Sequence, residues 1–111
     1  MATVANIYID QGANFSNTIT VTGADGNALT LTSYTAASQM RKSYSSSTAY
    51  SLNATVSDAS TGKVNISLTA AQSGAVPSGR YLYDVEITSP GGTKTRVVEG
   101  IAVVTPQITQ I

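Results

Sequence analysis

The chain has 111 residues, enough for one domain with one core, and its six basic and six acidic residues give a net charge of zero. A neutral chain lacks the basic excess that a nucleic-acid partner requires, and no segment approaches the run of about eighteen apolar residues that spans a membrane. The sequence has neither His nor Cys, which excludes Ser–His–Asp and Cys–His catalysis, His-based metal sites and disulfides.

Charged residues make up only 11% of the chain, against a usual share of about 25%. Hydroxyl side chains take their place, with 16 Thr and 14 Ser. Little charge is left to keep copies of the chain apart, which favours association; the alternative is a monomer with a sticky surface. The first six residues lack a basic region followed by an apolar run, so we expect no signal peptide.

The first half of the chain alternates apolar and polar residues, the pattern of half-buried strands. Asp25-Gly26 is the clearest turn signal, because Gly supplies the positive φ that a tight hairpin needs. Residues 10–13 also predict a break, and the polar residues 41–48 predict a loop. The predicted strands of this half cover residues 4–9, 15–21, 29–31, 34–41 and 50–56.

The second half continues the pattern after a turn at residues 58–62. Thr69 is a plausible N-cap for a single helical turn, and Pro77-Ser78-Gly79 breaks the chain before the next strand. We expect the last strand to be bulged at Gly100, where the order of apolar residues changes parity. The predicted strands and turn of this half cover residues 64–68, 80–87, 89–92 (a hairpin turn) and 93–105.

Seven to eight short strands with regularly spaced turns and no long helical period predict one all-β domain, residues 1–111. The expected fold is an antiparallel β-sandwich with a one-turn helix before the strand of residues 80–87. The inward rows of the strands supply the predicted core: Phe15, Ile19, Val21, Leu52, Val56, Val64, Ile66, Leu68, Val85 and Ile87.

The run of residues 68–87 resembles the E–F corner of immunoglobulin-like sandwiches, which implies an Ig-like antiparallel β-sandwich with the one-turn helix before its F-like strand. There a Tyr hydroxyl bonds back to the backbone a few residues upstream. Tyr81 is the candidate corner tyrosine, with Gly79 before it, and its expected partner lies between residues 72 and 76. Tyr83 stands where an antibody domain places its second Cys, so an aromatic ring fills that space. The alternative is an ordinary hairpin that begins with a tyrosine.

Few residues suggest chemistry. Asp84 and Glu86 share one strand face, but that face lies opposite the tyrosines, so solvent or a partner surface is a better explanation than catalysis. The residues around Asp25 and Asp58 lack the regularly spaced carboxylates of a Ca²⁺-binding loop, so we interpret both as turn residues. We therefore predict no catalytic residue, no metal site and no cofactor.

A small set of residues is the candidate contact surface. Arg41 and Lys42 with Tyr44 form a basic and aromatic patch, whose alternative is a solvated loop. The strand with Ile7 carries no charge before its end, and the last strand runs apolar around Ile101 and Val103. One of these two strands is the expected docking edge, unless both are paired inside the sheet.

Several runs resemble small Ig-like virion structural proteins of tailed bacteriophages, of the type found in phages of marine bacteria and cyanobacteria. They are also similar to the N-terminal sandwich of upper baseplate proteins. The similarity covers nearly the whole chain and rests on residues 7–13, 19–22, 25–27, 31–36, 39–43, 77–87 and 96–100.

The resemblance implies a non-enzymatic structural role in a virion, at the tail, baseplate, neck or capsid surface. The implied partners are other virion proteins in a homo- or hetero-oligomeric assembly, with no nucleic acid, membrane or small-molecule substrate. A carbohydrate- or receptor-binding module is the alternative. The inward alternation of the tyrosines counts against it, because a sugar platform needs exposed rings.

Overall fold

The alternating sequence forms an all-β fold with one short helix, as predicted. The computed structural model describes residues 3–23 and 26–108. Its elements are β1 (Thr3–Val4), β2 (Ile7–Asp10), β3 (Phe15–Thr20), β4 (Thr35–Arg41), β5 (Tyr50–Asp58), the 3₁₀ turn η1 (Ala59–Thr61), β6 (Lys63–Leu68), α1 (Ala70–Gly74), β7 (Gly79–Thr88) and β8 (Lys94–Thr105).

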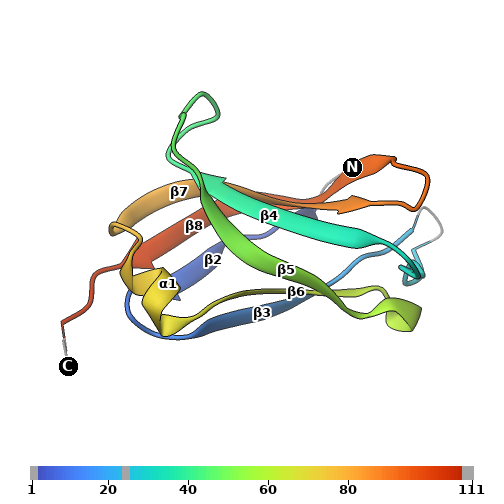
Figure 1. The fold of residues 1–111 in the computed structure, drawn as a ribbon, viewed down its shortest axis with the longest axis horizontal. Coiled ribbons are helices and arrows are strands. Elements are labelled where there is room, and N and C mark those ends of the chain that lie inside the picture. The colour runs from blue at the N-terminus through green and yellow to red at the C-terminus, as the bar shows by residue number, and fades with distance from the viewer. Residues whose placement is uncertain (1–2, 24–25, 109–111) are drawn as a thin grey trace.

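The strands make one curled sheet in the order β1-β8-β7-β4-β5-β6-β3, with β2 also paired to β8. The sheet turns over at β5, whose first residues pair with β4 and whose later residues pair with β6. Figure 1 shows β5 crossing from the layer of β4, β7 and β8 to the layer of β6 and β3. The two layers give the predicted sandwich, with the core between them.

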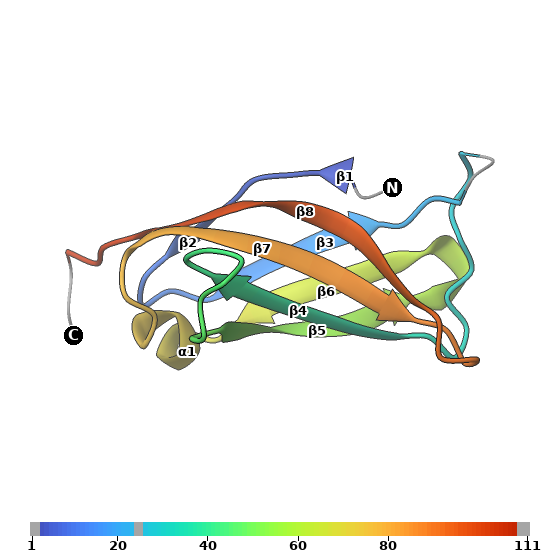
Figure 2. The ribbon, with the colours of Figure 1, turned by 90° about the horizontal axis from the view of Figure 1, so that it is seen from above.

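The first strands depart from the antiparallel prediction, because β1 and β2 run parallel to β8. Figure 2 shows β8 between β7 and the N-terminal strand. The expectation that β8 offers a docking edge is therefore wrong, since both of its sides are already paired. The first strand, which was the other candidate docking edge, does lie at an edge of the sheet.

The core is built from the inward rows of the central strands. Val64 and Ile66 on β6 have no exposed surface, and Tyr81, Tyr83, Val85 and Ile87 on β7 are all buried. Three residues of the predicted core, Phe15, Ile19 and Val56, are only partly buried. Two of the three lie on β3, the last strand of its layer, and within residues 3–23 and 26–108 no further strand lies beside it.

Helix α1 begins at the predicted cap. The Gln72 amide N–H donates to the Thr69 hydroxyl (3.2 Å), and the Thr69 N–H donates to the Gln72 side-chain oxygen (2.9 Å), which is a complete capping box. The buried Ser73 hydroxyl donates to the Ala13 carbonyl (2.7 Å). The helical turn is thus tied to the loop that joins β2 to β3.

The bulge in β8 lies at Val97, not at Gly100. The β7–β8 register runs from Val85↔Val98 to Glu86↔Arg96, so Val97 is the extra residue. Gly100 instead allows a close approach of two backbones, because a Cβ there would collide with the carbonyl oxygen of Ala5. The mixed parity of the sequence indicated a bulge, but only the pairing with β7 located it.

The predicted strand at residues 29–31 does not form. Only an isolated bridge, Thr22↔Ala28, follows the turn. Ala24 and Asp25 of the predicted hairpin lie outside the described residues, but Gly26 has the expected positive φ of 83°. The Leu31 amide donates to the Ala59 carbonyl (2.8 Å), so this segment is held by backbone contacts outside any ladder.

Candidate functional site

A groove of about 840 Å³ lies on the outer face of β4, β7 and β8. We call it the outer groove. Leu82 of β7 and Ile101 of β8, both half-buried, are paired across the two strands on its floor. The loop 42–49 overhangs it and rises above the sheet in Figure 1. At the opposite rim lies Val4 of β1, which is 71% exposed.

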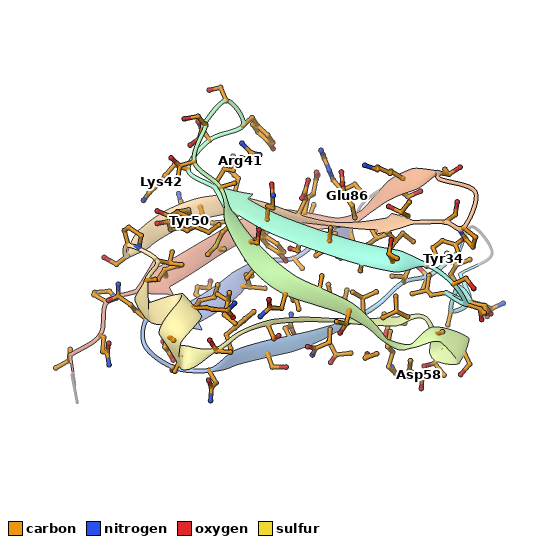
Figure 3. The ribbon with its side chains drawn as sticks, in the orientation of Figure 1. Tyr34, Arg41, Lys42, Tyr50, Asp58 and Glu86 are labelled. Carbon is orange, nitrogen blue, oxygen red and sulfur yellow. The ribbon has the colours of Figure 1, made fainter. Side chains whose placement is uncertain are left out.

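Arg41 holds the base of this loop. Its Nη1 donates to the Ser46 carbonyl (2.7 Å), and its Nη2 donates to the side-chain oxygen of Gln39 (3.2 Å). These bonds place Tyr44 at the groove with 82% of its surface exposed. Figure 3 shows Arg41 below the loop, with Glu86 further along the same outer side of the sheet. An anchored loop thus holds a large, exposed aromatic ring at the groove.

The charges of the groove do not balance. It is lined by three carboxylates, Asp84, Glu86 and Glu99, and two guanidiniums, Arg41 and Arg96. Arg96 bridges Asp84 (3.2 Å) and Glu99 (3.1 Å). Within the described part of the chain, Glu86 forms no ion pair. The groove therefore carries one surplus negative charge, and Glu86 is its unpaired carboxylate.

Asp84 lies at the centre of this charge cluster. Burial raises the pKa of its carboxyl, and the neighbouring Glu86 raises it further, while Arg96 acts in the opposite direction. Crowding of carboxylates therefore makes the ionised form of Asp84 less favourable than it is in water. A cation brought by a partner would relieve that crowding.

Three of the six predicted contact residues, Arg41, Tyr44 and Ile101, meet in the outer groove although they come from β4, the loop and β8. Val103 is half-buried on the same outer face, two residues further along β8. Ile7 is wrong as a contact residue, because only 4% of its surface is exposed and it packs in the core. Inward alternation on β2 explains this burial.

Lys42 points away from the groove to the corner. Its Nζ lies 4.4 Å from the centre of the Tyr81 ring, a cation–π contact. The edge of the Tyr81 ring also meets the ring of Tyr50, with centroids 5.7 Å apart. A Cβ on Gly79, whose φ is 143°, would collide with the Lys42 ammonium. Lys42 thus stabilises the corner and is less available to a partner.

The corner tyrosine itself is confirmed. Tyr81 is 1% exposed, and its hydroxyl donates to the Pro77 carbonyl at 2.6 Å. That acceptor lies one residue beyond the expected stretch 72–76, and the Val76 carbonyl just before it accepts from the Gln11 side chain (2.9 Å). Tyr83 fills the space of the absent disulfide and donates to the Ala5 carbonyl (2.6 Å).

Tyr81→Phe is expected to lower the free energy of unfolding by about 0.5–1.5 kcal/mol, because it removes one hydrogen bond and keeps the ring. Urea unfolding measures the change. Tyr8→Phe is the matched control, since Tyr8 is 69% exposed and its substitution should leave the midpoint unchanged. Equal effects of the two substitutions would contradict a stabilising role for the corner bond.

The sequence did not single out Gln39, Arg96 or Glu99 as contact residues. Asp84 and Glu86 were assigned to the outer face, and that face is the floor of the groove. The only available signal was the parity of β7, which places Leu82, Asp84 and Glu86 on one side. The neighbours from β4 and β8 follow from strand pairing, which the sequence does not state.

Among the described residues, no group of three acidic side chains is arranged to hold a metal ion. In the same ranges, no helix has the length and hydropathy to cross a membrane.

No family model matches the sequence, and no curated protein matches it. One solved structure with a similar fold is SGBP-B of the Bacteroides ovatus mixed-linkage glucan utilization locus, in complex with a mixed-linkage heptasaccharide (TM-score 0.44, 19% identity, 95% of this chain and 20% of that chain covered). Another is an internalin-like protein of Listeria monocytogenes (TM-score 0.47, 16% identity, 96% of this chain and 28% of that chain covered). This chain spans a fifth of the first protein and just over a quarter of the second.

Proposed function

We propose that this chain is a non-enzymatic structural module of a tailed-bacteriophage virion, and that it binds another virion protein in the outer groove. The observation that carries the binding proposal is the exposed Tyr44 held over a groove with an unpaired carboxylate, Glu86. The resemblance of residues 7–13, 77–87 and 96–100 to phage Ig-like proteins supports the virion setting.

The groove is suited to a polypeptide partner. Tyrosine is one of the side chains that dominate binding energy at protein interfaces, because it buries a large area at a small cost in conformational entropy. Leu82 and Ile101 offer apolar surface beneath it. The partner that fits is a segment with an apolar side chain next to a Lys or Arg, whose charge would pair with Glu86.

A carbohydrate is the second candidate ligand. Tyr44 stands near the planar polar groups of Gln39, Arg41 and Asp84, which line the same groove. An exposed ring can stack on a sugar while such groups hydrogen-bond its hydroxyls. One exposed ring is fewer than an extended glycan platform uses, so the protein partner is favoured.

The test places a photo-crosslinking amino acid at position 44 in the assembled particle. We expect it to capture one virion protein, whereas the same amino acid at Thr55, an exposed residue on β5, captures none. Once that protein is identified, Tyr44→Ser is expected to weaken its binding about 30-fold, the cost of truncating a central aromatic anchor. Isothermal titration calorimetry measures this change.

Charge reversal separates the candidates further. Glu86→Lys should abolish binding of a basic segment, while Thr55→Lys, which adds the same charge on β5, should leave it unchanged. Absence of the chain from purified particles by mass spectrometry would overturn the virion proposal. Binding of an oligosaccharide that is lost in Tyr44→Ser, without any protein partner, would establish the carbohydrate function in its place.

A further inference from the structure

Strand β3 is an open sheet edge. It ends the strand order and pairs with β6 on one side, and no strand of the described ranges pairs with its other side. The N-terminal strand β1, which could have covered it, pairs with β8 instead. Figure 1 shows β3 along the lower border of the fold. Its six residues include no Lys, Pro, Gly or charge, the usual guards against pairing with another chain.

One hydrogen bond next to β3 shows which of its backbone groups face β6 and which face the open side. The Val21 amide donates to the Gly62 carbonyl (2.7 Å), in line with the β3–β6 register. Peptide groups alternate in direction along an antiparallel ladder, so those of Phe15, Asn17 and Ile19 face β6. The peptide groups of Ser16 and Thr18 therefore face the open side.

The side chains of β3 are also incompletely covered. Phe15 and Ile19 point toward the core but are only half-buried, whereas their partners Leu68 and Val64 on β6 are buried. Asn17 lies between them on the same side and is exposed. One more strand beside β3 would cover both apolar side chains.

We propose that β3 pairs antiparallel with β3 of a second copy of this chain, across a two-fold axis at Asn17. In this register Phe15 lies opposite Ile19 of the other copy, and the two Asn17 amides meet each other. Ser16 and Thr18 lie opposite each other and exchange backbone hydrogen bonds. The two curled sheets become continuous across the pair.

The register is selected by the side chains. A shift of two residues in one direction places Asn17 opposite Ile19, and a shift in the other direction places it opposite Phe15. Both shifts set a polar amide against an apolar side chain, whereas the Asn17-centred register matches like with like. β3 carries no charge, so pairing with its own copy brings no like charges together.

This pairing surface is separate from the outer groove and does not depend on the proposed partner there. A single strand pair buries less area than a stable interface needs, so we expect a reversible monomer–dimer equilibrium. Sedimentation velocity of the unmodified chain should show its mean mass rising with concentration. Asn17→Lys sets two ammonium groups against each other on the axis and should leave only monomer, whereas Thr55→Lys should leave the equilibrium unchanged.

Cysteine crosslinking tests the register, because the chain has no Cys of its own. In the proposed pair, residue 17 faces itself at a non-hydrogen-bonded position with a Cα separation of about 4.5 Å, which lies within disulfide reach. Oxidised Asn17→Cys should therefore form a covalent dimer on a non-reducing gel. Thr18→Cys alone should not, since it faces Ser16, but a mixture of Ser16→Cys and Thr18→Cys chains should crosslink.

All these substitutions are at exposed positions, so the variants should keep the melting temperature of the parent chain, which circular dichroism checks. Crosslinking of Asn17→Cys no faster than that of Thr55→Cys would overturn the proposal. Equal crosslinking of Asn17→Cys and Thr18→Cys would overturn the register and leave non-specific collision as the explanation.

Discussion

Ile66→Ala is expected to lower the free energy of unfolding by about 2–5 kcal/mol. Ile66 has no exposed surface and lies on β6 between Asn17 of β3 and Ala54 of β5. The substitution removes buried apolar atoms and leaves a cavity, because neighbours held by two ladders cannot collapse into it. Urea unfolding measures the loss as a lower midpoint with an unchanged slope.

Ser67→Ala provides the matched control for this substitution. Ser67 is the next residue on β6 and points to the outer face of the sheet. Its removal should change stability by no more than about 0.5 kcal/mol, as surface substitutions usually do. If Ile66→Ala and Ser67→Ala had equal effects, the inward register of β6 would be contradicted.

Gly100→Ala is expected to destabilise the fold by about 1–3 kcal/mol, the cost of forcing an extra carbon into a packed site. A Cβ at this position collides with the Ala5 carbonyl oxygen and lies 3.2 Å from the Asn6 side-chain oxygen. The obstacle is backbone, so β1 and β2 must shift away from β8. That shift also strains the Tyr83 hydroxyl bond to the same carbonyl.

Hydrogen exchange distinguishes a local from a global effect. The Ala5 amide donates to the Glu99 carbonyl (2.9 Å), so its protection reports directly on the attachment of the first strands. Gly100→Ala should lower that protection more than it lowers protection of β6. Gly91→Ala is the control, because its Cβ would lie 3.9 Å from the nearest atom, the Ser89 hydroxyl. An unchanged Ala5 amide in Gly100→Ala would contradict the close approach of the two backbones.

Much of the fold was predictable from local pattern. The alternation in Val64, Ile66 and Leu68 identified a buried row, and Thr69 caps α1 as predicted. Tyr81 at the corner was predicted because the helical turn and the glycine before it resemble the E–F corner of immunoglobulin-like sandwiches. Each of these features depends on residues within a few positions of one another, which is the range over which a sequence pattern carries information.

The errors concern contacts between distant segments. Residues 29–31 have strand-like alternation but found no partner ladder beyond one bridge. The bulge was expected at Gly100 because the apolar residues change parity there, yet it formed at Val97, where β8 adjusts to β7. Ile7 was named as a contact because β2 lacks charge, but the pairing of β2 with β8 turned its side chain into the core.

The residues of the outer groove were likewise only partly predictable from the sequence. From the sequence, Arg41 and Tyr44 belonged to one loop, and Asp84 and Glu86 shared one strand face. That Arg96, Glu99 and Ile101 join them was decided by the pairing of β4 and β8 with β7.

The sequence by itself determined which residues of a regular strand share one face, since side chains alternate with period two. It also determined the neutral, hydroxyl-rich surface and the absence of His and Cys chemistry. The tertiary structure alone decided which strands became neighbours, because that choice depends on closing long loops and covering a shared core. In the folded chain β1 pairs with β8, so β8 lies inside the sheet and the edge of β3 is left open.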